Sequence, residues 1–257
     1  MPGLAHREEM PHSALRHRDL RLFLGARLTS VLSSEMVAVA VAWQVYEMTH
    51  RALSLGYVGL AQFLPSFLLF LIAGHVVDRF DRRLVLLVVQ ASYAGCAGLL
   101  LWYTLAGGSG AAAIYAILVL QGTVRAFGAP GGQAFMPELV PEEHFANAVT
   151  WGSSVFMMAT IVGPVLGWVV YGWLGGAAGV YGAAIAAYLA SFAFTAAIGT
   201  RTGRKEMRAA SLETLLEGIR YVRENAIILG SISLDLFAVL LGGAVALLPV
   251  FASDVLH

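Results

Sequence analysis

An all-α integral membrane fold is the prediction for this 257-residue chain, and three observations support it. Hydrophobic residues make up 58% of the sequence and charged residues only 12%, about half the charged share of soluble domains. The apolar residues form runs of about 20, the length that a helix needs to cross the hydrocarbon layer. Because the runs lack the alternating ten-residue pattern of barrel strands, helices satisfy the backbone in lipid better than a barrel does.

Hydropathy predicts seven spans. They are Leu20 to Tyr46, Leu55 to Val77, Leu84 to Ala106, Ala111 to Pro130, Thr150 to Leu174, Val180 to Thr200 and Ala226 to Phe251. Residues 1–19 are polar and have no apolar core followed by a cleavage site, so we predict a cytoplasmic tail rather than a removable signal.

The basic residues predict the orientation. Fifteen of the 16 lysines and arginines lie on one side of the predicted spans, and Arg51 alone lies on the other. Since cytoplasmic loops carry the excess of basic residues, the N-terminus is predicted in the cytoplasm of a multi-pass protein of the cytoplasmic (inner) membrane. Seven spans then leave His257 outside.

A polar link, residues 201–225, separates a six-helix bundle over 20–200 from residues 226–257, the first helix of a second bundle. Apolar residues recur at helical spacing behind Ser211, a suitable N-cap, and predict an amphipathic surface helix. They are Leu212, Leu215, Leu216, Ile219 and Val222. A plain linker is the alternative.

The turn between the second and third spans, GHVVDRFDRR, places five charges between two long apolar runs. Its residues of interest are Gly74, Asp78, Arg79, Asp81, Arg82 and Arg83. Carboxylates and guanidinium groups this close can pair with each other and with helix ends, and so form a conformational latch. The alternative is that these charges only set topology and anchor the loop.

Two further patterns lie within the spans. Gly163 and Gly167 form a small face that lets two helices approach closely, and Pro164 favours a bend. Glu35 and Asp235 are carboxylates inside predicted spans, and burial favours the protonated form, so both are candidates for proton coupling. The alternatives are a carboxylate hydrogen-bonded near Ser33 or Ser34 for Glu35, and pairing with a basic group for Asp235.

Composition argues against several other classes. Basic residues form no extended tract for phosphate, so no nucleic-acid partner is expected. Cys96 is the only cysteine, which leaves no disulfide framework or multi-cysteine metal site. No His-Glu-x-x-His pair, Gly-x-Ser-x-Gly elbow or Walker loop is present, so we expect no enzyme, no catalytic residue, no metal and no cofactor.

These motifs together resemble the major facilitator superfamily, closest to its siderophore and drug exporter branch. The family loop Gly-x-x-x-Asp-Arg-x-Gly-Arg-Arg is met by the turn above, with Asp81 in place of the second glycine. The segment from helix four into helix five is similar to that branch at Arg125, Phe127, Pro130, Pro137, Pro141 and Asn147. Gly163, Pro164 and Gly167 resemble the antiporter signature of helix five, with Trp168 at its last glycine.

A second departure lies in helix four, where Gln121 and Gly122 match the family pattern but Leu118 occupies its arginine position. Arg125 follows Gln121 by four residues, on about the same helix face, and could supply the missing charge. Arg125 and Gln121 are therefore candidates for a cavity or electrostatic role.

The resemblance implies the N-terminal half of a twelve-helix transporter plus helix seven. The expected activity is proton-coupled efflux of a small molecule, such as a drug or siderophore, by rocking of two bundles. Expected partners are that molecule, membrane lipid and a C-terminal half absent from this chain, with the proton gradient as energy source. A truncated sequence is the simplest expectation; the alternative is a non-transporting or regulatory half-transporter.

Overall fold

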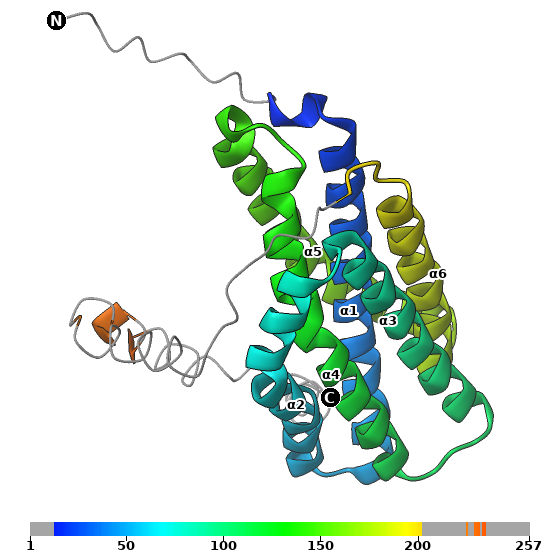
Figure 1. The fold of residues 1–257 in the computed structure, drawn as a ribbon. Coiled ribbons are helices and arrows are strands. Elements are labelled where there is room, and N and C mark those ends of the chain that lie inside the picture. Colours follow the sequence, from blue (N-terminus) through cyan, green and yellow to red (C-terminus); the bar gives the residue numbers. More distant parts are fainter. Residues whose placement is uncertain (1–12, 202–224, 226–228, 232, 235–257) are drawn as a thin grey trace, which may run out of the picture.

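The computed structural model describes residues 13–201, 225, 229–231 and 233–234. Six long helices cross the molecule (Figure 1): α1 (Arg18–Thr49), α2 (Ala52–Arg79), α3 (Arg82–Leu105), α4 (Ala111–Phe135), α5 (Phe145–Trp173) and α6 (Ala177–Ala196). Short 3-10 turns are η1 (Ala14–Arg16), η2 (Met136–Glu138) and η3 (Glu142–His144). All six helices are long and apolar enough to span a membrane, and the described residues include no strand. The all-α membrane fold is confirmed.

Helix boundaries differ most from prediction around the connection between α4 and α5. Helix α4 continues past Pro130 to Phe135, although proline lacks a backbone donor. Its last turns are held by packing, since the rings of Phe135 and Phe23 lie 6.0 Å apart in an edge-to-face contact. Helix α5 begins at Phe145, five residues before the predicted start, because Ala148 is fully buried in the bundle.

Several predicted features lie outside the described residues. They are most of the tail, most of the link 201–225, most of the predicted seventh span and Asp235. Their predicted roles stay predictions.

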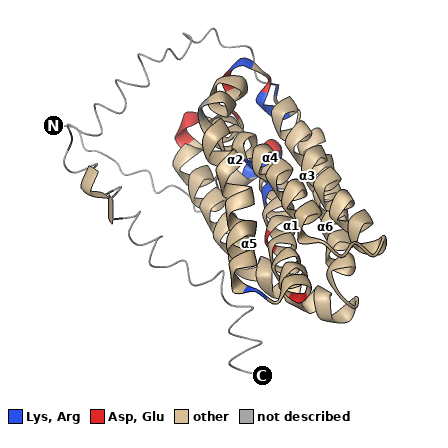
Figure 2. Cartoon of the chain, turned by 90° about the horizontal axis from the view of Figure 1, so that it is seen from below, with Lys and Arg blue, Asp and Glu red and all other residues tan. Residues whose placement is uncertain are grey.

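The helices pack in an arc whose order in space is α5, α1, α6, α3, α4, α2. Each helix packs against its neighbours in this order, whereas α5 and α2, at the two ends of the arc, make at most slight contact. Helix α1 touches α2 and α4 only sparsely. The arc is therefore open between its two ends, and α1, α2 and α4 line a pocket on this side. Figures 1 and 2 show the arrangement of the six helices from two directions.

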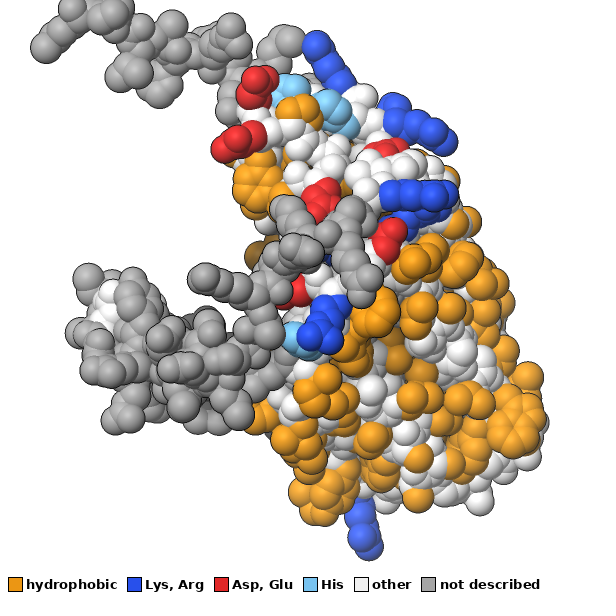
Figure 3. Space-filling view, in the orientation of Figure 1, with side chains coloured by type: hydrophobic (Ala, Val, Ile, Leu, Met, Phe, Trp, Pro, Cys, Tyr) orange, Lys and Arg blue, Asp and Glu red, His pale blue; other side chains and the backbone are white. Residues whose placement is uncertain are grey.

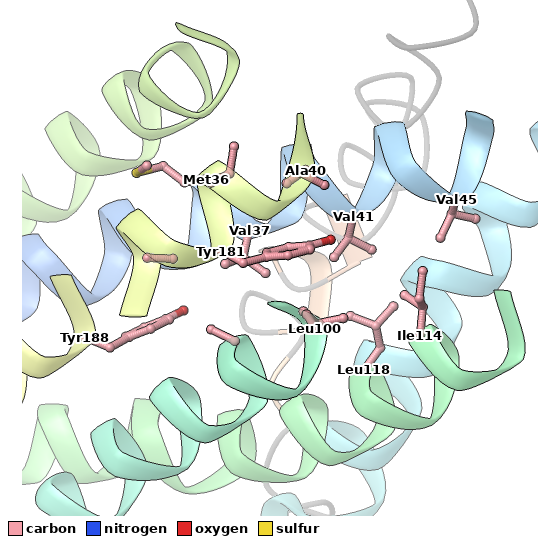
Figure 4. Packing of buried hydrophobic residues seen from close by; sticks show 14 residues of the cluster. Met36, Val37, Ala40, Val41, Val45, Leu100, Ile114, Leu118, Tyr181 and Tyr188 are labelled. Atoms are coloured by element: carbon pink, nitrogen blue, oxygen red, sulfur yellow. The ribbon is translucent and has the colours of Figure 1, made fainter. Parts of the chain in front are cut away.

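Two hydrophobic clusters fill the arc at different depths. The first lies around Val37, Val41 and Tyr181 and joins α1, α3, α4 and α6 (Figure 4). The second lies around Leu20, Phe135 and Ile198, nearer the start of α1. Outside both clusters, α2 and α5 keep large apolar side chains exposed, as expected of helices that face lipid or other helices.

The two ends of the bundle differ in charge. We call the end at which α1 begins, and at which the α2–α3 turn lies, the basic end. Figure 3 shows basic side chains gathered there, above a largely apolar lateral surface. Arg51, the N-cap of α2, lies at the opposite end.

Candidate functional site

A polar pocket lies on the open side of the arc, near the middle of α1, α2 and α4. Its volume is about 80 Å³. It is lined by Ser34, Glu35 and Ala38 of α1, Gln62 of α2, and Gln121, Gly122 and Arg125 of α4. Along the sequence, Ser34 and Glu35 of α1 and Gln121, Gly122 and Arg125 of α4 fall between the parts of these helices that build the two hydrophobic clusters. The bundle is thus polar at mid-depth and apolar above and below.

The register of α4 decides which side chains reach the pocket. Gln121 and Arg125 are four residues apart and share one face of the helix, as the sequence predicted. Leu118, at the position where the family pattern has arginine, is fully buried in the first hydrophobic cluster. Position 118, where the family pattern has arginine, therefore belongs to the hydrophobic core in this chain. Arg125 instead brings a guanidinium group to the pocket.

Gly122 sets the distance between α4 and α2. A Cβ atom at this position would overlap the backbone oxygen of Gln62 and lie 3.0 Å from its carbonyl carbon. Ser66 reinforces the approach, because its hydroxyl donates to the carbonyl oxygen of Gly122 at 2.6 Å. This close contact brings Gln62 of α2 into the same pocket as Gln121 of α4.

Gly163 and Gly167 set the distance between α5 and α1. A Cβ at position 163 would lie 2.5 Å from the Cβ of Glu35, and one at 167 would lie 3.0 Å from the Cα of Met36. Pro164 lies between them within an unbroken helix. The two glycines therefore let α5 press against the segment of α1 that carries Glu35. Trp168 packs beside this contact, its ring 5.1 Å from that of Trp43.

The polar side chains of the pocket are held apart from one another. Within the described residues, no hydrogen bond joins Glu35, Gln62, Gln121 and Arg125, and no ion pair joins Glu35 to Arg125. The Oε1 atom of Gln121 is buried without a partner. Ser33, considered as a partner of Glu35, donates instead to the carbonyl oxygen of Thr29 at 2.7 Å. The pocket therefore contains both hydrogen-bond donors and hydrogen-bond acceptors that no described protein group uses.

The predicted turn region at the basic end ties three helices together. Asp81 caps α3, accepting from the backbone N–H of Arg83 at 2.9 Å. Arg82 forms an ion pair with Glu138 of η2, the one such pair among the described residues. Arg83 donates to the carbonyl oxygens of Thr195, at 3.2 Å, and Ala196, in the last turn of α6. The Thr195 oxygen also accepts from the backbone N–H of Ile198 at 3.3 Å.

The other predicted residues of this turn make fewer contacts. Arg79 is exposed at the end of α2, and Asp78 and Gly74 are half-buried. In the described part of the chain, the side chains of Asp78 and Arg79 form no hydrogen bond or ion pair. The contacts thus concentrate on the second half of the motif, and they join helices of this bundle.

Two more contacts brace the basic end. One carboxylate oxygen of Asp19, at the start of α1, accepts from the N–H of Gly199 and from both the N–H and hydroxyl of Thr200, at 2.6 to 3.1 Å. His17 and His144 share a hydrogen bond of 2.9 Å between their rings. Helix α1 is therefore fixed at its start to the end of α6 and to the connection that precedes α5.

Sequence reasoning missed several of these residues. Glu138 could have been suspected, since it is a carboxylate next to Pro137 at the end of a span. Nothing in the sequence around Gln62 singled it out. The role of Gly122 as a spacer, and of Thr195 as an acceptor, depends on which helices are neighbours in space.

The family model described as "Transmembrane secretion effector" matches residues 9–257, nearly the whole chain. The chain belongs to the major facilitator superfamily. The residues that the family model matches include all six described helices. The fold and the motifs predicted from the sequence agree with this assignment.

Three relatives illustrate the range of the similarity. The enterobactin exporter EntS of Citrobacter koseri is 28% identical over 83% of this chain and 51% of its own length. The multidrug efflux pump Tap of Mycobacterium tuberculosis is 28% identical over 91% and 58%. The uncharacterized MFS-type transporter YkuC of Bacillus subtilis is 27% identical over 73% and 45%. The chain spans about half the length of these relatives.

Proposed function

We propose that this superfamily member is a proton-coupled exporter of a small molecule, working by alternating access in the cytoplasmic membrane with its basic end inside. The observation that carries the proposal is the polar pocket at mid-depth, which holds a carboxylate, Glu35, with no ion-pair partner among the described residues. An ionisable group at membrane depth is costly and marks a pathway by default.

The proposed mechanism assigns Glu35 to the proton. An unpaired carboxylate beside a guanidinium group can be loaded with a proton from the outside and release it when Arg125 comes closer. Because the pocket lies on the open side of the arc, a second bundle would close it, and rocking of the two would expose it to each side in turn. The relatives named as exporter and efflux pump support the outward direction.

In this proposal the contacts at the basic end keep the six helices moving as one body. Arg82, Arg83 and Asp19 connect α1, α3, α6 and η2, so that motion occurs against the second bundle rather than within this one. No cofactor is needed, since the proton gradient supplies the energy. Membrane lipid and the transported molecule are the proposed partners.

Transport assays on everted membrane vesicles test the proposal. Vesicles from cells that express the gene encoding this chain are energised by respiration and offered a panel of dyes and siderophores, and uptake is measured by mass spectrometry. We expect at least one compound to accumulate and an uncoupler to abolish the accumulation. Glu35→Gln should remove this gradient-dependent uptake, because glutamine cannot carry the proton.

The matched control is Glu47→Gln. Glu47 lies on the same helix but outside the pocket, where its carboxylate accepts from the Tyr171 hydroxyl at 3.0 Å. We expect this variant to transport like the wild type. Undiminished gradient-dependent uptake by Glu35→Gln would remove Glu35 as the proton carrier, and the absence of any uncoupler-sensitive uptake would reject the proposed function.

A further inference from the structure

The polar pocket also carries information about the molecule it holds. Gln121 is only 7% exposed, yet its Oε1 atom has no hydrogen-bond partner. Buried polar side chains in folded proteins nearly always form hydrogen bonds, because burial removes their hydrogen bonds to water and this costs free energy unless a new hydrogen bond replaces them. A buried amide that is left unbonded beside a pocket is therefore a group that a ligand can satisfy.

The amide of Gln121 can also serve either as a hydrogen-bond donor or as an acceptor. A half-turn about its last side-chain bond exchanges the oxygen and the nitrogen, and this torsion is soft. Among the described residues, neither Oε1 nor the side-chain nitrogen of Gln121 holds a hydrogen bond, so the turn breaks none. Gln121 can thus present either an acceptor or two donors to the pocket.

The two charges of the pocket indicate the charge of the ligand. Glu35 and Arg125 both line it, and they are not joined as an ion pair. A cationic group would be attracted by Glu35 and repelled by Arg125, and an anionic group would meet the reverse. A neutral group with a donor on one side and an acceptor on the other is favoured by both charges.

We infer that this pocket binds an uncharged group of the transported molecule that both donates and accepts hydrogen bonds, such as a carboxamide, urea, sulfonamide or phenol. The donor side meets Glu35 and the Oε1 of Gln121, and the acceptor side meets Arg125. A volume of about 80 Å³ holds one such group, while the rest of the molecule extends toward the open side of the arc. This inference rests on the proposed function.

Binding of matched fluorescent probes tests the inference without any ion gradient, so its failure leaves the transport assay untouched. The probes are dansylamide, a neutral primary sulfonamide; its N,N-dimethyl analogue, which has lost both N–H donors; and dansyl sulfonate, an anion with the same ring system. The full chain in lipid nanodiscs is titrated with each probe, and empty nanodiscs give the background from lipid.

We expect dansylamide to bind about tenfold or more tightly than either analogue, because a site built around hydrogen bonds rejects a ligand that leaves them unmade. Equal binding of the dimethyl analogue would overturn the inference, since the donors would then be irrelevant. Tighter binding of dansyl sulfonate than of dansylamide would overturn the inference that the bound group is uncharged. Absence of saturable dansylamide binding would also overturn it, and the pocket would then hold water alone.

Gln121→Met provides the second arm, because methionine keeps the size and removes the amide. We expect this variant to lose most of the preference for dansylamide over its dimethyl analogue. The matched control is Gln90→Met: Gln90 is 6% exposed, but its amide donates to the Thr195 hydroxyl at 3.3 Å and lies outside the pocket. It should keep the preference.

A stability measurement keeps the second arm decisive if a variant folds poorly. Cys96 is the only cysteine and is buried, so a fluorogenic maleimide reports thermal unfolding. Gln121→Met should unfold at or above the temperature of the wild type, because its amide oxygen gives up no bond, while Gln90→Met should unfold lower. A lower temperature for Gln121→Met than for Gln90→Met would show that the Gln121 amide is bonded within the protein, and would overturn the inference.

Discussion

Replacing Glu138 by alanine is expected to destabilise the bundle by about 3 kcal/mol, because it leaves a mostly buried guanidinium group without its partner. The side chains of Arg82 and Glu138 are only 11% and 20% exposed. Breaking a buried pair costs more than the pair itself contributes, since the remaining charge stays desolvated. Maleimide labelling of Cys96 during a temperature ramp measures the loss.

The double variant Arg82→Met with Glu138→Leu separates the cost of a lone charge from the value of the pair. We expect it to be more stable than Glu138→Ala, because neither charge remains buried. Glu142→Ala is the control, as Glu142 is exposed on η3 and should change stability little. If Glu138→Ala unfolds at the same temperature as the wild type, the ion pair contributes nothing to holding α3 against η2.

Gly122→Ala is expected to destabilise the bundle by about 1–3 kcal/mol, the usual cost of forcing extra atoms into a packed contact. The added methyl group meets the backbone of Gln62 rather than a movable side chain, so α2 has to shift away from α4. That shift also stretches the hydrogen bond from Ser66 to the Gly122 carbonyl. The same thermal assay reports the change.

Gly98→Ala is the matched control for this prediction. Gly98 lies within α3, and a Cβ there would have nothing within 4 Å. Because alanine favours a helix over glycine by roughly 0.5–1 kcal/mol, we expect no loss of stability. The two substitutions are chemically identical and differ only in surroundings. A Gly122→Ala variant as stable as Gly98→Ala would mean that α2 and α4 approach less closely than described.

The fold was predictable from the sequence because membrane helices are defined by composition along one segment. Apolar runs of the right length specified each of the six helices, and only their ends moved. Hydropathy placed the end of α4 at Pro130, five residues too early. Burial of Phe135 stabilises the last turns and outweighs the one hydrogen bond that the proline lacks. Patterns within one segment of the sequence do not show such packing against other helices.

The candidate site was predictable only in part, for a related reason. Glu35, Gln121 and Arg125 stand out locally, as polar residues inside apolar runs. Their convergence with Gln62 depends on α2 and α4 lying side by side, which spacing within one helix cannot specify. Likewise, Asp81 and Arg83 were recognised within their turn, but the acceptors at the end of α6 are more than a hundred residues away.

The arrangement of the arc has a consequence for how the protein is made. Helix α1 leaves the ribosome first, yet its packing partners are α5 and α6, the last described helices to be synthesised. Arg27 lies over the ring of Phe156, 5.4 Å from its centre, and Ser191 donates to the carbonyl oxygen of Ala26 at 2.7 Å. Until those helices arrive, the nascent α1 carries Arg27 and Glu35 without them, at a cost in bare lipid. Completion of this bundle is therefore a late event, in which the first helix must be sheltered until the sixth has been inserted.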